Sequence, residues 1–122
     1  MQYAIATLGS HTALQILKGA KDGIIVYDKD LRYRIWNPFM ENVSGKSEKE
    51  VLGRQAEEVF PFLREVGQIA VLEKVLQEGI VIENEFSTIL PDRRRIWNRN
   101  ASTPLKNPAG KIIGVIKKPK NR

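Results

Sequence analysis

The stretch from Asp22 to Gly45 constrains the fold of this 122-residue chain more than any other segment. Residues 23–27 form a short apolar run with β-branched side chains, which predicts a strand. Residues 28–30 supply a turn, because Asp side chains accept hydrogen bonds from nearby backbone N–H groups. Tyr33 and Ile35 then alternate with two arginines, which predicts a second strand with one buried face.

A helix is predicted directly after this strand pair. Asn37 is a favoured N-cap residue, and Pro38 fits the first helical position. Gly45 can end the helix in the left-handed conformation. The order strand, turn, strand, helix is therefore fixed within about two dozen residues.

The rest of the chain predicts further helices followed by three strands. Capping-box patterns indicate short helices near 12–20 and 47–53, and a further short helix over 55–60 is stopped by Pro61. Helical periodicity indicates a long helix over 62–78. Alternation and turn residues indicate strands over 80–90, 93–105 and 111–118. We therefore expect an α+β fold, with helices across one face of a five-stranded antiparallel sheet.

In order and spacing these motifs resemble a PAS domain, the small sensory domain of signalling proteins, over about residues 12–118. The resemblance is carried by Asp22-Gly23, Asp28 to Asp30, Trp36-Asn37-Pro38, Ser44-Gly45, Ser102 to Leu105, Asn107 to Gly110 and Ile113 to Val115. It implies a PAS-like fold. It also divides the chain into a leader (1–11), a PAS domain (12–118) with a flanking helix (12–20) and a core (22–118), and a basic tail (119–122).

Composition excludes several classes of protein. The chain has no cysteine, which rules out disulfides, thiolate nucleophiles and thiolate metal sites and fits a cytoplasmic domain. No run approaches about 20 apolar residues, and no signal-peptide pattern opens the chain, so we expect no membrane span in this segment.

Positive charge is concentrated at the C-terminal end. Residues 91–122 hold ten Lys and Arg against one Asp, whereas residues 1–90 carry a net charge of −3. A basic end can meet nucleic acid, an acidic partner or anionic lipid. Because no aromatic residues interleave with the charges of the tail, we favour a solvated strand edge and do not expect nucleic-acid binding.

The sequence shows no catalytic constellation, so we expect no enzyme activity from this domain. His11 is the only histidine, and it lies in the leader. The serines at helix starts have no histidine partner, and Glu57 and Glu58 are neighbours on a helix, so they do not face each other. No metal site is expected.

The resemblance also bears on cofactors, whose identity the sequence leaves unknown. Flavin-binding relatives form a covalent adduct through a cysteine, but the matching run here is Gly53-Arg54-Gln55-Ala56, with alanine at that position. Haem-binding relatives use a histidine on the long helix, and residues 62–78 contain none. Covalent flavin chemistry is therefore excluded, and His-ligated haem is not expected.

Polar residues mark a candidate ligand site on the strand over 93–105. By alternation Asn98, Asn100 and Ser102 share one face, which can point toward the helices together with Thr88 and Asn84 of the neighbouring strand. Such buried amides would need a ligand, ordered water or a bonded network. In the alternative register Trp97 points inward and the amides meet water. The predicted ligand-contacting residues are Gln55, Thr88, Trp97, Asn98 and Asn100.

The resemblance implies a regulatory function. A PAS domain of this kind senses a small ligand or relays a conformational signal to an output domain, such as a histidine kinase or a transcription regulator. We expect a homodimer, with Trp97 and the helix over 12–20 at the contact, and we expect the chain to be part of a longer signalling protein. The alternative is a ligand-free module for dimerisation or protein docking.

Overall fold

A computed structural model describes residues 15–16, 19–89 and 92–119, with side chains for all of these except 86–89 and 96–98. It is an α+β fold, as predicted. The elements, in chain order, are β1 (Ile25–Asp28), β2 (Tyr33–Trp36), α2 (Pro38–Ser44), α3 (Glu48–Val51), α4 (Ala56–Val59), α5 (Phe62–Glu65), α6 (Gln68–Glu78), β3 (Ile82–Ile89), β4 (Arg95–Lys106) and β5 (Ile112–Pro119). The predicted leader and most of the predicted helix over 12–20 lie outside the described residues.

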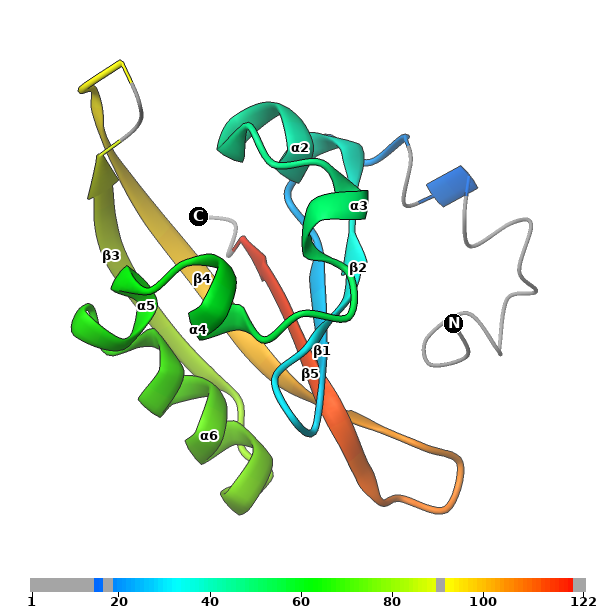
Figure 1. The fold of residues 1–122 in the computed structure, drawn as a ribbon. Coiled ribbons are helices and arrows are strands. Elements are labelled where there is room, and N and C mark those ends of the chain that lie inside the picture. Colours follow the sequence, from blue (N-terminus) through cyan, green and yellow to red (C-terminus); the bar gives the residue numbers. More distant parts are fainter. Residues whose placement is uncertain (1–14, 17–18, 90–91, 120–122) are drawn as a thin grey trace.

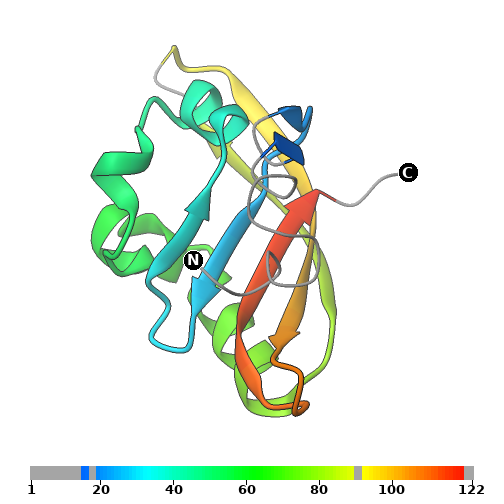
Figure 2. The same cartoon turned by 90° about the vertical axis from the view of Figure 1, so that its right-hand side faces the viewer.

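The five strands form one antiparallel sheet in the order β2-β1-β5-β4-β3. The helices α2 to α6 gather on one face of this sheet (Figure 1), and Figure 2 shows the strands side by side from the other face. α6 packs on β4 and β5, whereas α3 packs beside β2 (Figure 1). We call the side of the sheet that these helices cover the helix-covered face.

The predicted opening motif forms as the sequence indicated. The side chain of Asn37 accepts a hydrogen bond from the Met40 N–H as N-cap of α2, Pro38 is its first residue, and Gly45 ends it with a φ of 75°. Asp28 Oδ1 accepts from the Asp30 N–H at 2.9 Å, which closes the β1–β2 turn.

One strand departs from simple alternation. Val26 pairs with Ile35 and Tyr27 pairs with Tyr33, so Arg34 is an extra residue that forms a β-bulge. Tyr33 is consequently buried on the helix-covered face with Tyr27, and Ile35 is buried on the opposite face with Val26. The prediction that Tyr33 and Ile35 share one buried face was wrong, because the bulge shifts the strand's register by one residue.

The predicted long helix is divided into two. α5 and α6 are separated at Gly67, whose φ of 83° lies in the left-handed region. A residue in that conformation cannot continue a right-handed helix. The prediction of a single helix over 62–78 was therefore wrong, although Gly79 ends α6 in the left-handed conformation as predicted.

The main core lies between the helix-covered face and α6. Aromatic side chains of β1, β2 and the C-terminal end of α4 meet there. Trp36 stacks on Phe60 at a ring-centroid distance of 5.8 Å, and Tyr33 contacts Tyr27 and Trp36. From α6, Ile69, Leu72 and Val75 complete the cluster. The helices are thus held to the sheet mainly by apolar burial.

Candidate functional site

Polar side chains lie in a row across β3, β4 and β5. Asn84 pairs with Asn100, Ile82 pairs with Ser102, and Ser102 pairs with Lys117. Residues paired across antiparallel strands project from the same face of the sheet. Ile82 packs against the main core, so this row belongs to the helix-covered face.

Three members of this region are buried where apolar residues would be expected. Ser102, Gln68 at the start of α6, and Lys117 are 0%, 1% and 6% exposed. The Lys117 Nζ donates a hydrogen bond to the Gln68 Oε1 at 3.0 Å, which connects β5 to the helix above it. Burial lowers the pKa of Lys117 to about 8, because a low-dielectric surrounding disfavours the charged form.

Three buried polar atoms have no hydrogen-bond partner among the described residues: the Gln68 Nε2, the Asn84 Oδ1 and the Ser102 Oγ. Buried polar groups in folded proteins almost always have a partner in the protein, in ordered water or in a ligand. We name Gln68, Asn84, Ser102 and Lys117 the buried polar cluster. Its unsatisfied groups are what a bound polar molecule would meet.

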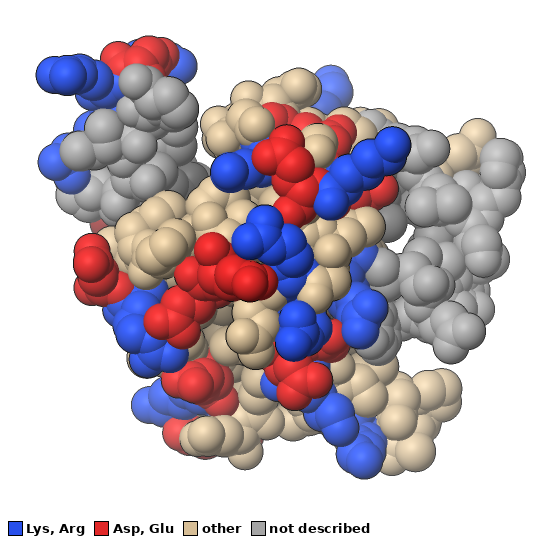
Figure 3. Space-filling view, in the orientation of Figure 1, with Lys and Arg blue, Asp and Glu red and all other residues tan. Residues whose placement is uncertain are grey.

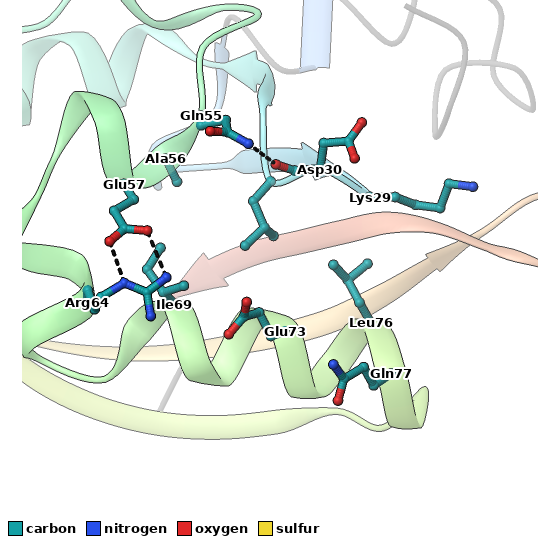
Figure 4. A pocket seen from close by; sticks show the side chains of 11 residues that line it. Lys29, Asp30, Gln55, Ala56, Glu57, Arg64, Ile69, Glu73, Leu76 and Gln77 are labelled. Carbon is teal, nitrogen blue, oxygen red and sulfur yellow. Dashed lines mark hydrogen bonds and ion pairs between the residues drawn. The ribbon is translucent and has the colours of Figure 1, made fainter.

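A second candidate region is an open cleft of about 390 Å³ between α6, α4 and the β1–β2 turn. Figure 4 shows Gln55 at its rim, where the Gln55 Nε2 donates to the backbone oxygen of Asp30 at 3.3 Å. At the same cleft Arg64 of α5 pairs with Glu57 of α4, and its guanidinium holds the pKa of Glu57 below the usual range. Both partners of that pair are exposed, so water screens it.

Charge on the helical side of the molecule is mixed. In Figure 3 acidic and basic side chains alternate over the helices, without one large patch of either sign on this face. The cleft repeats this pattern, with Lys29 and Arg64 facing Asp30, Glu57 and Glu73. Such a surface offers no strong electrostatic preference for an anion or a cation.

The structure distributes the predicted ligand-contacting residues over both regions. Gln55 lines the cleft, and Asn100 lies beside the buried polar cluster through its pairing with Asn84. The backbone pairs Thr88 with Ile96, but the side chains of Thr88, Trp97 and Asn98 lie outside the described part of the chain. Ligand contact by all five residues stays a prediction.

Sequence reasoning missed Lys117 and Gln68. The basic C-terminal end was predicted as a solvated strand edge, but β5 lies in the middle of the sheet, and for Lys117 that prediction was wrong. A signal was present, because Lys117 alternates with Val115, which is fully buried. Gln68 carried no comparable signal, since glutamine is ordinary on a helix surface.

Neither a metal centre nor a membrane span is evident in the described part of the chain. Within residues 15–16, 19–89 and 92–119, no three His, Cys, Asp or Glu side chains are grouped to hold a metal ion. Over the same residues, no helix has both the length and the apolar character to cross a bilayer.

Solved structures with the same fold come from signalling proteins. The PAS domain of the histidine kinase ThkA is 25% identical, with a TM-score of 0.67, and the match covers 82% of this chain and 98% of that one. VqmA of Vibrio cholerae is 18% identical, with a TM-score of 0.77, and the match covers 92% of this chain and 51% of the VqmA chain. An RNA-binding light-oxygen-voltage receptor is 22% identical, with a TM-score of 0.74.

The extent of these matches differs among the relatives. The match to the RNA-binding receptor covers 95% of this chain but only 33% of the receptor, so this chain corresponds to one part of that protein. No curated protein matches the chain in sequence. The family model described as the PAS fold matches residues 17–117. With that match over most of its length, the chain belongs to the PAS fold family.

Proposed function

We propose that this chain is the sensory module of a longer signalling protein. It takes up a small polar molecule between the sheet and the helices, and it passes the resulting change to an output domain such as a histidine kinase or a transcription regulator. In this role it works in the cytoplasm as a homodimer and carries no catalytic step of its own.

The observation that carries this proposal is the buried polar cluster. Three buried polar atoms on α6, β3 and β4 have no hydrogen-bond partner within the described part of the chain, and such atoms are costly in a core unless something binds them. Two structural relatives point the same way, since ThkA is a histidine kinase and VqmA has been solved bound to the molecule DPO.

The physical mechanism is a shift between two conformations. A ligand shifts such an equilibrium only by binding one state more tightly than the other. A molecule held by Gln68 and Lys117 touches both α6 and β5, so it stabilises one relative position of helix and sheet. That position is the signal that an output domain can read.

A specific observation favours a second candidate, a ligand-free module for dimerisation or docking. The part of the core between β2 and α4 is filled by the chain's own aromatic rings. Trp36 and Phe60 are stacked, and the ring centroids of Phe60 and Phe62 are 6.0 Å apart. A module whose whole core is filled in this way would act through its surface alone.

Native mass spectrometry with an absorption spectrum on the same sample separates the two candidates. A mass above the 13.9 kDa of the chain, lost on denaturation, supports the sensory module and gives the mass of its ligand. An absorption band would identify that ligand as a chromophore. A bare mass combined with a dimer peak favours the ligand-free module.

A further inference from the structure

We infer that the buried polar cluster is a binding site for a small carboxylate, with Lys117, Gln68 and Ser102 as its donors. This inference rests on the proposed sensory function and names the chemical class of its ligand.

The donors come from three different elements and meet across the sheet. Ser102 of β4 lies directly opposite Lys117 of β5, and Gln68 of α6 is joined to Lys117 by the 3.0 Å hydrogen bond. The ammonium of Lys117, the Gln68 Nε2 and the Ser102 hydroxyl are all hydrogen-bond donors. Donors of this kind, one of them charged, suit a carboxylate better than a neutral or cationic group.

The helix that carries Gln68 adds to the preference for an anion. α6 begins at Gln68, so the positive end of its backbone dipole lies at the cluster. Its first turn contains no acidic residue, and Gly67 provides no side-chain cap. A carboxylate bound here would meet the positive end of this dipole as well as the donors of the cluster.

The Asn84 Oδ1 indicates which group the ligand carries besides its carboxylate. The Asn84 Oδ1 is a buried acceptor without a partner among the described residues, and it lies on β3, two residues beyond the partner of Ser102. A hydroxyl group on the ligand would donate to it. A small hydroxycarboxylate offers a carboxylate for the donors and a hydroxyl for this acceptor, so L-lactate is a suitable probe.

The test is a titration of the ¹⁵N-labelled chain with formate, L-lactate and succinate at constant ionic strength, followed by NMR. Lactamide serves as the matched neutral probe, since it has the shape of lactate without the charge. We expect saturable shifts at Gln68, Ser102 and Lys117 with at least one carboxylate and none with lactamide.

Three variants locate the binding. Lys117→Met removes the ammonium at similar volume and is expected to weaken binding at least tenfold, as for loss of a charged hydrogen bond. Ser102→Ala should weaken it by roughly three- to tenfold while leaving the fold intact. Lys118→Met is the control, because the next residue of β5 is exposed and should bind like the parent.

Three results would overturn the inference: no saturable shift with any of the carboxylates, equal shifts with lactamide, or unchanged affinity in Ser102→Ala. Ser102→Ala keeps the test decisive if Lys117→Met does not fold. A neutral molecule retained in the native mass spectrum, together with no carboxylate binding, would remove this inference and leave the sensory function standing. A bare mass together with no carboxylate binding would remove both.

Discussion

Asn37 connects three backbone segments that are separate in the sequence. Its Oδ1 accepts from the N–H groups of Ile24 and Met40, and its Nδ2 donates to the backbone oxygen of Asp22 at 2.9 Å. The side chain therefore fixes the entry into β1 to the exit from β2 and also caps α2. Sequence reasoning identified the cap but not the two bonds to the residues before β1.

Replacing Asn37 should cost more than replacing an ordinary helix cap. Because Asn37→Ala leaves buried backbone groups unsatisfied, we expect the free energy of unfolding to fall by about 2–4 kcal/mol. Ser47→Ala, which removes the exposed cap of α3, should cost about 1 kcal/mol. Urea denaturation measures both, and equal losses would show that the extra bonds of Asn37 contribute nothing.

Lys117 should make the stability of the ligand-free protein depend on pH. Its folded pKa is lowered to about 8, and its unfolded pKa is near 10.5. Between these values the unfolded chain binds more protons than the folded one, so the free energy of unfolding rises as the pH rises. We expect a gain of about 2 kcal/mol between pH 7 and 9.5, measured by urea denaturation.

The control for this prediction is Lys118→Met, which should keep the gain, whereas Lys117→Met should lose it. An unchanged gain in Lys117→Met would assign the effect to other groups. The measurement stops at pH 9.5 because burial raises the pKa of Tyr27 and Tyr33. Above about pH 10 tyrosines of the unfolded chain lose their protons first, and stability falls again.

At the scale of single elements, local chemistry predicted the boundaries well and missed two irregularities. Caps and turn residues such as Asn37 and Gly79 act within a few residues, so sequence alone locates them. The bulge at Arg34 is set by contacts between β1 and β2, and the break at Gly67 is hidden by apolar residues that continue at helical spacing through it. Local periodicity contains no information about such contacts.

The effect of Gly67→Ala on stability should have opposite signs for one continuous helix and for two helices that are separated at Gly67. If residues 62–78 formed one helix, Gly67→Ala would stabilise the protein by about 1 kcal/mol. With Gly67 at a φ of 83°, the same change should destabilise it by about 1–2 kcal/mol. Thermal or urea denaturation gives the sign, and Gln77→Ala on the exposed side of α6 is the near-neutral control.

Gly114 is required by the close approach of β1 and β5. A methyl group added there would overlap the backbone oxygen of Tyr27, and Gly114 pairs directly with Asp28. Gly114→Ala should therefore lower the free energy of unfolding by about 2–3 kcal/mol, because the strands must separate. Gly110→Ala adds a methyl group in open space at a φ of 85° and should cost only about 1 kcal/mol.

For the whole molecule, the sheet order makes β5 indispensable. It lies between β1 and β4, so without it the sheet divides into two separate hairpins. A chain ending at Lys106 should show no cooperative unfolding transition, because two-stranded hairpins are marginal in water. A chain ending at Pro119 should unfold like the parent. Circular dichroism during urea denaturation would contradict this if the shorter chain unfolded cooperatively.

Of the candidate site, sequence reasoning predicted the residues of β3 and β4 but not those of β5 and α6. Alternation placed Asn84, Asn100 and Ser102 on one face, since amides and hydroxyls in a strand stand out from apolar residues. Gln68 could not be added and Lys117 was assigned to a solvated edge, because their burial follows from the position of α6 and from the sheet order. Both depend on contacts between residues far apart in the chain.

The central position of β5 also affects how the domain forms on the ribosome. β1 leaves the exit tunnel early, but its second neighbour in the sheet is translated about 80 residues later. At ordinary elongation rates, β1 waits on the order of ten seconds with one edge unpaired. Chaperones that shield exposed strand edges during translation should therefore contact the β1–β2 hairpin until the last strand has emerged.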